Sequence, residues 1–123
     1  MDVAKARREG MQMSMGLGFN QADATKIAVV ISELGRNIVN YAGSGTITVI
    51  ARSETNGKKY MRIIADDKGP GIPDVERVLA GGYTTSNGLG LGISGSKKLV
   101  DEFSIHSEVG KGTTVTAVKW LVK

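Results

Sequence analysis

The chain has 123 residues, 41% hydrophobic and 23% charged, which is the composition of one modest globular domain rather than of a disordered or fibrous protein. Its net charge of +4 has no basic run behind it and only 5% of the residues are aromatic, so we expect no nucleic-acid partner. The absence of cysteine and the presence of a single histidine exclude disulfides, Cys/His zinc sites and any convincing Ser-His-Asp triad. No stretch predicts a membrane span or a signal peptide, so we expect a single domain, residues 1–123, in the cytoplasm and without a membrane partner.

Two helices are predicted in the N-terminal part. Residues 2–15 have loosely helical hydrophobic spacing, although alternating methionines also permit a strand, and we favour a helix that Gly16 and Gly18 close. The second helix is predicted to begin after the capping residue Asn20 and to end at Gly43. Its apolar stripe consists of Ala24, Ile27, Ala28, Ile31, Leu34, Ile38 and Tyr41.

The opposite, polar face of this second helix carries Glu33 and Asn37, which are neighbours because they are four residues apart. An asparagine oxygen is a suitable ligand for Mg²⁺, and a carboxylate one turn away could accept a proton from an attacking hydroxyl. A solvated helix face would explain the same pair. Arg36 and Lys26 lie near this face and could add charge to a phosphate site or be ordinary surface residues.

The rest of the chain predicts paired strands with intervening helices. Two hairpins are expected, one turned at Asn56-Gly57 and one at residues 109–112. The expected elements are strands at 46–52 and 59–66, a short helix at 74–80, a polar loop at 81–87, a helix opened by residues 88–92, and strands at 103–108 and 113–121. This order predicts an α+β fold: a two-layer α/β sandwich with helices on one face of a mixed, mostly antiparallel sheet.

Glycine is concentrated in the second half of the chain, where ten of the seventeen glycines lie between residues 69 and 112. Gly90, Gly92 and Gly95 match the spacing G-x-G-x-x-G, but they follow a polar loop rather than a buried strand, and no Gly-Lys-Ser/Thr P-loop occurs. A glycine-rich segment that leads into a helix N-terminus could present backbone N–H groups to phosphate oxygens. A flexible loop before a helix would explain the spacing equally well.

A second glycine motif, Asp67-x-Gly69-x-Gly71, stands at the end of a predicted strand. The carboxylate could accept a hydrogen bond from an exocyclic amine such as that of adenine, and the glycines would let the backbone pass close under a flat base. An ordinary turn closed by an Asx-type hydrogen bond is the alternative.

Four motifs in this order resemble the GHKL (Bergerat-fold) ATPases over nearly the whole chain from Asn20 onward. They are Glu33-Leu-Gly-Arg-Asn37, Asp67-Lys-Gly69-Pro-Gly71, Gly88-Leu-Gly90-Leu-Gly92 and Gly110-Lys-Gly112-Thr113. The stretches 31–38, 67–74, 83–86 and 97–103 are in turn similar to the anti-sigma-factor serine/threonine kinases, especially the switch kinases of bacterial stressosomes.

This resemblance implies a serine/threonine protein kinase that depends on ATP and Mg²⁺. It implies Glu33 as the general base, Asn37 as the Mg²⁺ ligand that bridges to the phosphates, and Asp67 as the residue that reads the adenine amino group, supported by the hydroxyl of Thr113. The remaining implied ATP-binding residues are Gly69 and Gly71 beside the base, Gly88, Gly90 and Gly92 at the phosphates, and Thr84, Thr85 and Ser86 in a mobile lid.

The same resemblance implies protein partners. The substrate would be a STAS-domain antagonist or scaffold protein, and the kinase, once released from it, would activate a metal-dependent protein phosphatase. The alternative function is a non-catalytic, ATP-binding partner-switching module, such as one that sequesters a sigma factor. His106 fits none of these roles, and strand alternation predicts that it is exposed beside Ser104.

Two features depart from the family pattern. The family usually opens with a strand before the first helix, whereas this chain starts essentially at that helix, so we expect the sheet to lack that edge strand. Gly35 stands inside the second helix, where it should cost about 0.5–1 kcal/mol relative to alanine unless close packing requires it.

Overall fold

The computed structural model describes residues 1–80 and 89–121, without the side chains of residues 78 and 89–91. The predicted elements are all found in this part of the chain, with boundaries shifted by a few residues. In chain order they are α1 (Val3–Leu17), α2 (Gln21–Asn37), the π-helical turn η1 (Ile38–Ala42), β1 (Gly45–Ser53), β2 (Lys59–Asp67), α3 (Val75–Ala80), α4 (Leu89–Leu99), β3 (Glu102–Glu108) and β4 (Gly112–Trp120).

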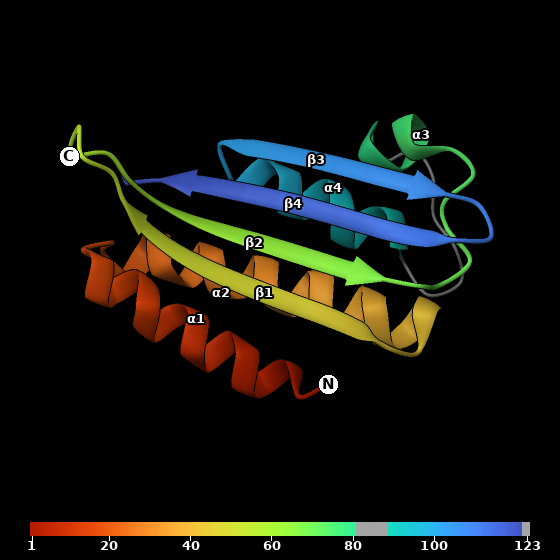
Figure 1. Ribbon diagram of the computed structural model, residues 1–123, viewed down its shortest axis with the longest axis horizontal. Helices are drawn as coiled ribbons and strands as arrows, with labels where there is room; N and C mark the ends of the chain where they lie inside the picture. The colour runs from red at the N-terminus through yellow and green to blue at the C-terminus, as the bar shows by residue number, and fades with distance from the viewer. Residues whose placement is uncertain (81–88, 122–123) are drawn as a thin grey trace.

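The strands form one sheet in the order β1-β2-β4-β3, and each of the three pairings is antiparallel. Figure 1 shows α2 and α4 behind the sheet, so the helices cover one of its faces. The predicted two-layer α+β sandwich is therefore confirmed, and its sheet is wholly antiparallel among the described strands. As expected, none of these strands precedes α1.

The first segment, α1, is a helix, which is the structure that the sequence analysis favoured over a strand. Asp2 caps it by accepting a hydrogen bond from the backbone N–H of Lys5 at 3.0 Å, and Gly18 ends it with φ of 119°. The face of α1 that packs on α2 is buried at Gly10 and Ser14, and a Cβ at Gly10 would overlap the side chain of Ile31. Small residues set this contact, which a pattern of hydrophobic residues could not predict.

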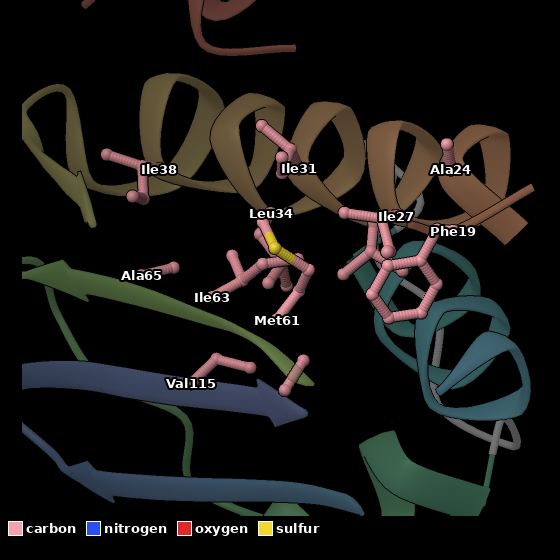
Figure 2. Packing of buried hydrophobic residues seen from close by; sticks show 12 residues of the cluster. Phe19, Ala24, Ile27, Ile31, Leu34, Ile38, Met61, Ile63, Ala65 and Val115 are labelled. Atoms are coloured by element: carbon pink, nitrogen blue, oxygen red, sulfur yellow. The ribbon is translucent and has the colours of Figure 1, made fainter. Parts of the chain in front are cut away.

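Helix α2 lies under the centre of the sheet and carries much of the core. Its cap is the predicted one, because Asn20 Oδ1 accepts a hydrogen bond from the N–H of Asp23 at 2.8 Å. Figure 2 shows side chains of its apolar stripe pointing toward β2 and β4. The buried cluster includes Ile27, Ile31 and Leu34 from α2, Ile38 from η1, and Met61, Ile63, Ala65 and Val115 from the sheet.

The predicted second helix reaches Ala42, but its last turn is π-helical rather than α-helical. The change occurs directly after Asn37, and Gly43, with φ of 81°, ends the turn as predicted. Such π turns lie frequently at functional sites, because the wider turn alters the direction of the side chains next to it.

Gly35 is explained by the packing of three elements. A Cβ at this position would lie 3.1 Å from both methyl groups of Val3 in α1 and 3.3 Å from Ile47 Cδ1 in β1. The close approach of α1 and β1 to α2 therefore favours glycine over a larger residue. This is the close packing that the sequence analysis named as the one reason for a glycine inside the helix.

Both predicted hairpins are present. The β1–β2 register closes with Ser53 opposite Lys59, and Gly57 in the turn has φ of 83°. The β3–β4 register closes with Glu108 opposite Gly112. The predicted polar loop at 81–87 lies outside the described residues. Of the helices that are described, none is both long and apolar enough to cross a membrane.

Candidate functional site

A pocket opens where α2 passes into η1 and where β2 ends. Its walls are largely apolar and include Ile38, Ala65, Ile72 and Ile93. Four of the residues predicted from the motifs also line it, namely Asn37, Asp67, Gly71 and Thr113. Mostly apolar walls with a few polar groups are typical of a site for a small organic molecule.

Asp67 lies at the C-terminal end of β2, where the strand leads into the glycine motif. Its Oδ1 accepts a hydrogen bond from the N–H of Gly69 at 2.8 Å, so the predicted Asx-type turn is present. An ionised carboxylate has acceptor capacity on both oxygens, and Oδ2 remains as the one that a ligand could use. The turn and the binding role are therefore compatible with each other.

The two glycines after Asp67 are required by backbone packing. A Cβ at Gly69 would lie 2.7 Å from the Cβ of Ala42 in η1. Gly71 has φ of 81°, and a Cβ there would overlap the carbonyl of Glu108 in the β3–β4 turn. These contacts press the segment after β2 against η1 and the second hairpin, and Gly71 thereby lines the pocket.

Thr113 stands directly opposite Asp67 in the β2–β4 register. Its hydroxyl is 2.9 Å from Ser107 Oγ, so its recorded hydrogen bond goes to β3 rather than to the Asp67 carboxylate. Ser107 Oγ also accepts the N–H of Ile72 at 2.7 Å and lies 3.2 Å from the carbonyl of Gly112. Ser107 thus ties the segment after Asp67 to the second hairpin.

Sequence reasoning missed Ser107 as a site residue. The signal was present in the strand alternation, because Ser107 shares the inward side of β3 with Phe103 and Ile105. A polar residue on a face that otherwise packs on the core needs a hydrogen-bond partner.

Glu33, Asn37 and Gly92 come together where α2 meets the first turns of α4. A Cβ at Gly92 would lie 3.1 Å from Glu33 Oε2 and 3.5 Å from Asn37 Oδ1. A Cβ at Gly92 would therefore press on the Glu33 carboxylate and touch the Asn37 amide at ordinary contact distance, so glycine leaves room beside Glu33. Gly90 lies two residues closer to the start of α4, whereas Gly88, Thr84, Thr85 and Ser86 lie outside the described residues.

The amide of Asn37 has an unused hydrogen-bonding group. Its Nδ2 is buried and has no hydrogen-bond partner among the described residues. An unsatisfied buried polar group costs about 1–3 kcal/mol, which a ligand oxygen would relieve. Turned by half a rotation, the same amide would present its oxygen instead, so this position fits either a phosphate oxygen or a hard cation such as Mg²⁺.

Glu33 is paired with Arg36. Arg36 Nη2 lies 2.5 Å from Glu33 Oε1, and the Glu33 side chain is 32% exposed. Arg36 therefore contacts the predicted base directly, while Oε2 lies on the side of Gly92. Lys26 instead pairs with Asp23 at 3.7 Å, as a surface lysine would. His106 is exposed on the outer side of β3, as predicted.

Known proteins share these motifs. The sequence profile described as "Histidine kinase-, DNA gyrase B-, and HSP90-like ATPase" matches residues 22–122, a stretch that contains all four motifs. The chain belongs to this ATPase family. It is 48% identical over 98% of its length to the serine/threonine-protein kinase RsbT of Bacillus subtilis (strain 168), of which it covers 90%. It is also 31% identical to an anti-sigma F factor of Geobacillus kaustophilus, over 82% of this chain and 72% of that protein.

The similarity to RsbT indicates the enzyme class within this family. With the similarity to RsbT, the chain falls in the serine/threonine protein kinase branch of these ATPases, and the use of ATP follows from the family. The similarity to anti-sigma F factors places it among partner-switching regulators.

Solved structures agree on the fold. The histidine kinase domain of the Erythrobacter litoralis EL346 blue-light-activated histidine kinase has a TM-score of 0.58 and 17% identity, with 95% of this chain and 59% of that chain covered. Full-length ShkA, crystallised with AMPPNP, has a TM-score of 0.58 and 17% sequence identity, and the match covers 95% of this chain and 28% of ShkA. The chain thus spans less than two thirds of either structure, and the likeness shows the fold alone.

Proposed function

We propose that residues 1–123 form a single-domain, Mg²⁺- and ATP-dependent serine/threonine protein kinase of the RsbT type that phosphorylates a STAS-domain antagonist or scaffold protein of a bacterial stressosome. The observation that carries the proposal is the meeting of Glu33, Asn37 and Gly92 beside the pocket that Asp67 lines. The 48% identity to RsbT supports it. A cytoplasmic location stays a prediction.

In this proposal the adenine of ATP enters the apolar pocket. Asp67 accepts a hydrogen bond from the adenine amino group, and the bond that Gly69 donates to Oδ1 holds the carboxylate in place. Thr113 supports this end of the site through Ser107, which fastens the segment after Asp67 to β3 and β4.

The triphosphate in this proposal lies at the N-terminal end of α4. Gly88, Gly90 and Gly92 present backbone N–H groups there, where the positive end of the helix dipole favours anions. Thr85 belongs to the lid over the phosphates. The Asn37 amide holds the Mg²⁺, which when bound neutralises phosphate charge.

The chemical step needs a positioned acceptor and a base. The oxygen of the substrate's serine or threonine hydroxyl attacks the γ-phosphorus, a new P–O bond forms, and the bond to the ADP oxygen breaks. Glu33 takes the proton of the hydroxyl on Oε2, the oxygen that Arg36 leaves unpaired. Phosphoryl transfer depends mainly on positioning and charge neutralisation, so one carboxylate, one metal and several amides suffice.

Partner switching completes the proposal. Phosphorylation of a STAS protein of the RsbS or RsbR kind releases the kinase, which then binds and activates a metal-dependent protein phosphatase of the RsbU kind. The similarity to RsbT and to anti-sigma F factors supports a regulator of this class.

A second function is a non-catalytic ATP-binding module that captures a partner such as a sigma factor. The similarity to anti-sigma F factors favours it. The two functions differ in what they require of Glu33, because capture without transfer needs no base.

The test is transfer of label from radioactive ATP, with Mg²⁺, to candidate STAS proteins. We expect Glu33→Ala to keep its affinity for ATP but to lower transfer by about 10²–10⁴-fold, the usual contribution of a general base. Glu9→Ala is the matched control, since Glu9 is also a helical glutamate in a surface ion pair. Unchanged transfer by Glu33→Ala would remove Glu33 from its role, and ATP binding without transfer to any STAS protein would favour the second function.

A further inference from the structure

A second groove lies between α2 and α4, on the other side of Glu33 from Asn37 and the pocket. Val29 and Glu33 from α2 line it, together with Gly92, Gly95, Lys98 and Leu99 from α4. None of these residues lines the pocket that contains Asp67, so the groove and the pocket are separate hollows that meet near Glu33 and Gly92.

The groove exists because α4 lacks side chains there. Gly92 and Gly95 are three residues apart and therefore share a face of the helix. Apart from the adjacent backbone of α4, no atom of the described part of the chain lies within 4 Å of the position that a Cβ of Gly95 would take, so packing there does not require a glycine. Gly95 is also the one glycine of the G-x-G-x-x-G pattern to which the proposed ATP site gives no role.

The lining of the groove is apolar with a basic margin. Val29 and Leu99 are half-buried and form its walls. Ser96 is buried and donates its hydroxyl to the carbonyl of Gly92 at 2.8 Å, so it is not available to a partner. Lys98 is exposed and makes no ion pair with the described residues, and the one acidic residue in the lining, Glu33, is already paired with Arg36.

We propose that this groove binds the acceptor segment of the protein substrate, so that its serine or threonine hydroxyl reaches Glu33. The inference rests on the proposed kinase function and names the surface that the substrate uses. Because Glu33 lines the groove, a segment seated there delivers its hydroxyl to the base from the side away from the adenine pocket. The apolar walls and the unpaired Lys98 select a segment with an apolar side chain and an acidic one near the acceptor.

The test fills the groove without touching the ATP site. Gly95→Leu places a side chain in a position that the described residues leave open. Gly16→Leu is its control, since Gly16 is also helical and no described residue outside its own helix backbone comes within 4 Å of its Cβ position. The probe is a STAS-domain protein that the wild-type kinase phosphorylates. We expect Gly95→Leu to raise the KM for this protein by about tenfold or more, which corresponds to about 1.4 kcal/mol, and to leave the Kd for ATP unchanged. We expect Gly16→Leu to change neither.

A charge reversal provides a second measurement that does not depend on how Gly95→Leu folds. Lys97 and Lys98 are both exposed in the last turn of α4, but only Lys98 lines the groove. Lys98→Glu should raise the KM several-fold, with a larger effect at low salt, and Lys97→Glu should not.

The outcomes separate the inference from the function on which it rests. An unchanged KM in Gly95→Leu, equal effects in the two lysine variants, or a loss of ATP binding that accounts for the Gly95→Leu defect would overturn the groove assignment alone. Failure of the wild-type chain to phosphorylate any STAS protein would overturn the proposed function, and the groove assignment with it.

Discussion

The hydroxyl of Ser107 in β3 connects the segment after β2, which is distant in the sequence, to the start of the neighbouring strand β4. It accepts a hydrogen bond from the N–H of Ile72, and it lies within hydrogen-bond distance of the Gly112 carbonyl and the Thr113 hydroxyl. One hydroxyl can satisfy all three groups, because it has two acceptor positions and one proton. Ser107 therefore holds the segment after Asp67 against the sheet.

We expect Ser107→Ala to lower the free energy of unfolding by about 1–3 kcal/mol, since it leaves partly buried polar groups without a partner. Ser104→Ala is the control, because Ser104 is exposed on the other side of the same strand. The measurement is urea denaturation, in which Ser107→Ala should have a lower midpoint concentration of urea than the wild type and an unchanged m-value. Equal midpoints for the two variants would contradict the role of Ser107.

Sequence could predict the polar residues of the site better than their contacts. Glu33, Asn37 and Asp67 were singled out because four motifs occur in the order of a known family, since each motif alone fits a surface face or a turn, and their roles stay predictions. The ion pair between Glu33 and Arg36 was not predicted, because a helical spacing of three permits contact but does not require it. Ser107 was missed because its distant partner, the N–H of Ile72, lies 35 residues earlier in the chain, a contact that local sequence patterns do not indicate.

At the scale of elements, the capping and turn residues and the hydrophobic periodicity were sufficient to predict most helices and strands. Asn20 and Gly43 bounded the second helix correctly, and Gly57 marked the first hairpin. The π-helical turn was not predicted, because a hydrophobic stripe with a period of 3.6 barely changes over a single wider turn. For the first segment, the alternating methionines permitted a strand as well as a helix. The structure has a helix there, which buries Gly10 and Ser14 against α2.

Two helical glycines should respond in opposite ways to alanine. Gly95→Ala should raise the free energy of unfolding by about 0.5–1 kcal/mol, because it improves helix propensity and meets open space. Gly35→Ala should gain nothing, because Val3 and Ile47 would have to move away from the new methyl group. Urea denaturation of both variants measures this difference. A gain at Gly35 as large as at Gly95 would show that α1 and β1 do not press on α2 there.

At the scale of the whole molecule, the site is assembled at one end of the sheet by elements that are far apart in sequence. The end of α2, the end of β2 and the start of α4 meet there, as Figure 1 shows for their arrangement. Helices and strands could be predicted from local patterns, but their meeting point could not, because it depends on the strand order β1-β2-β4-β3. Only the family resemblance indicated that the four motifs belong to one site.

The most direct test of this assembled site is calorimetric titration of ATP, with and without Mg²⁺, into the wild-type chain, Asn37→Ala and Asn40→Ala. Asn40 is the control, because it is an exposed asparagine one turn beyond Asn37. The account predicts Mg²⁺-dependent binding to the wild type and to Asn40→Ala, and an affinity at least about tenfold lower, or about 1.4 kcal/mol, for Asn37→Ala. A folded wild-type chain that takes up no nucleotide, or an Asn37→Ala variant that binds as the wild type does, would contradict it.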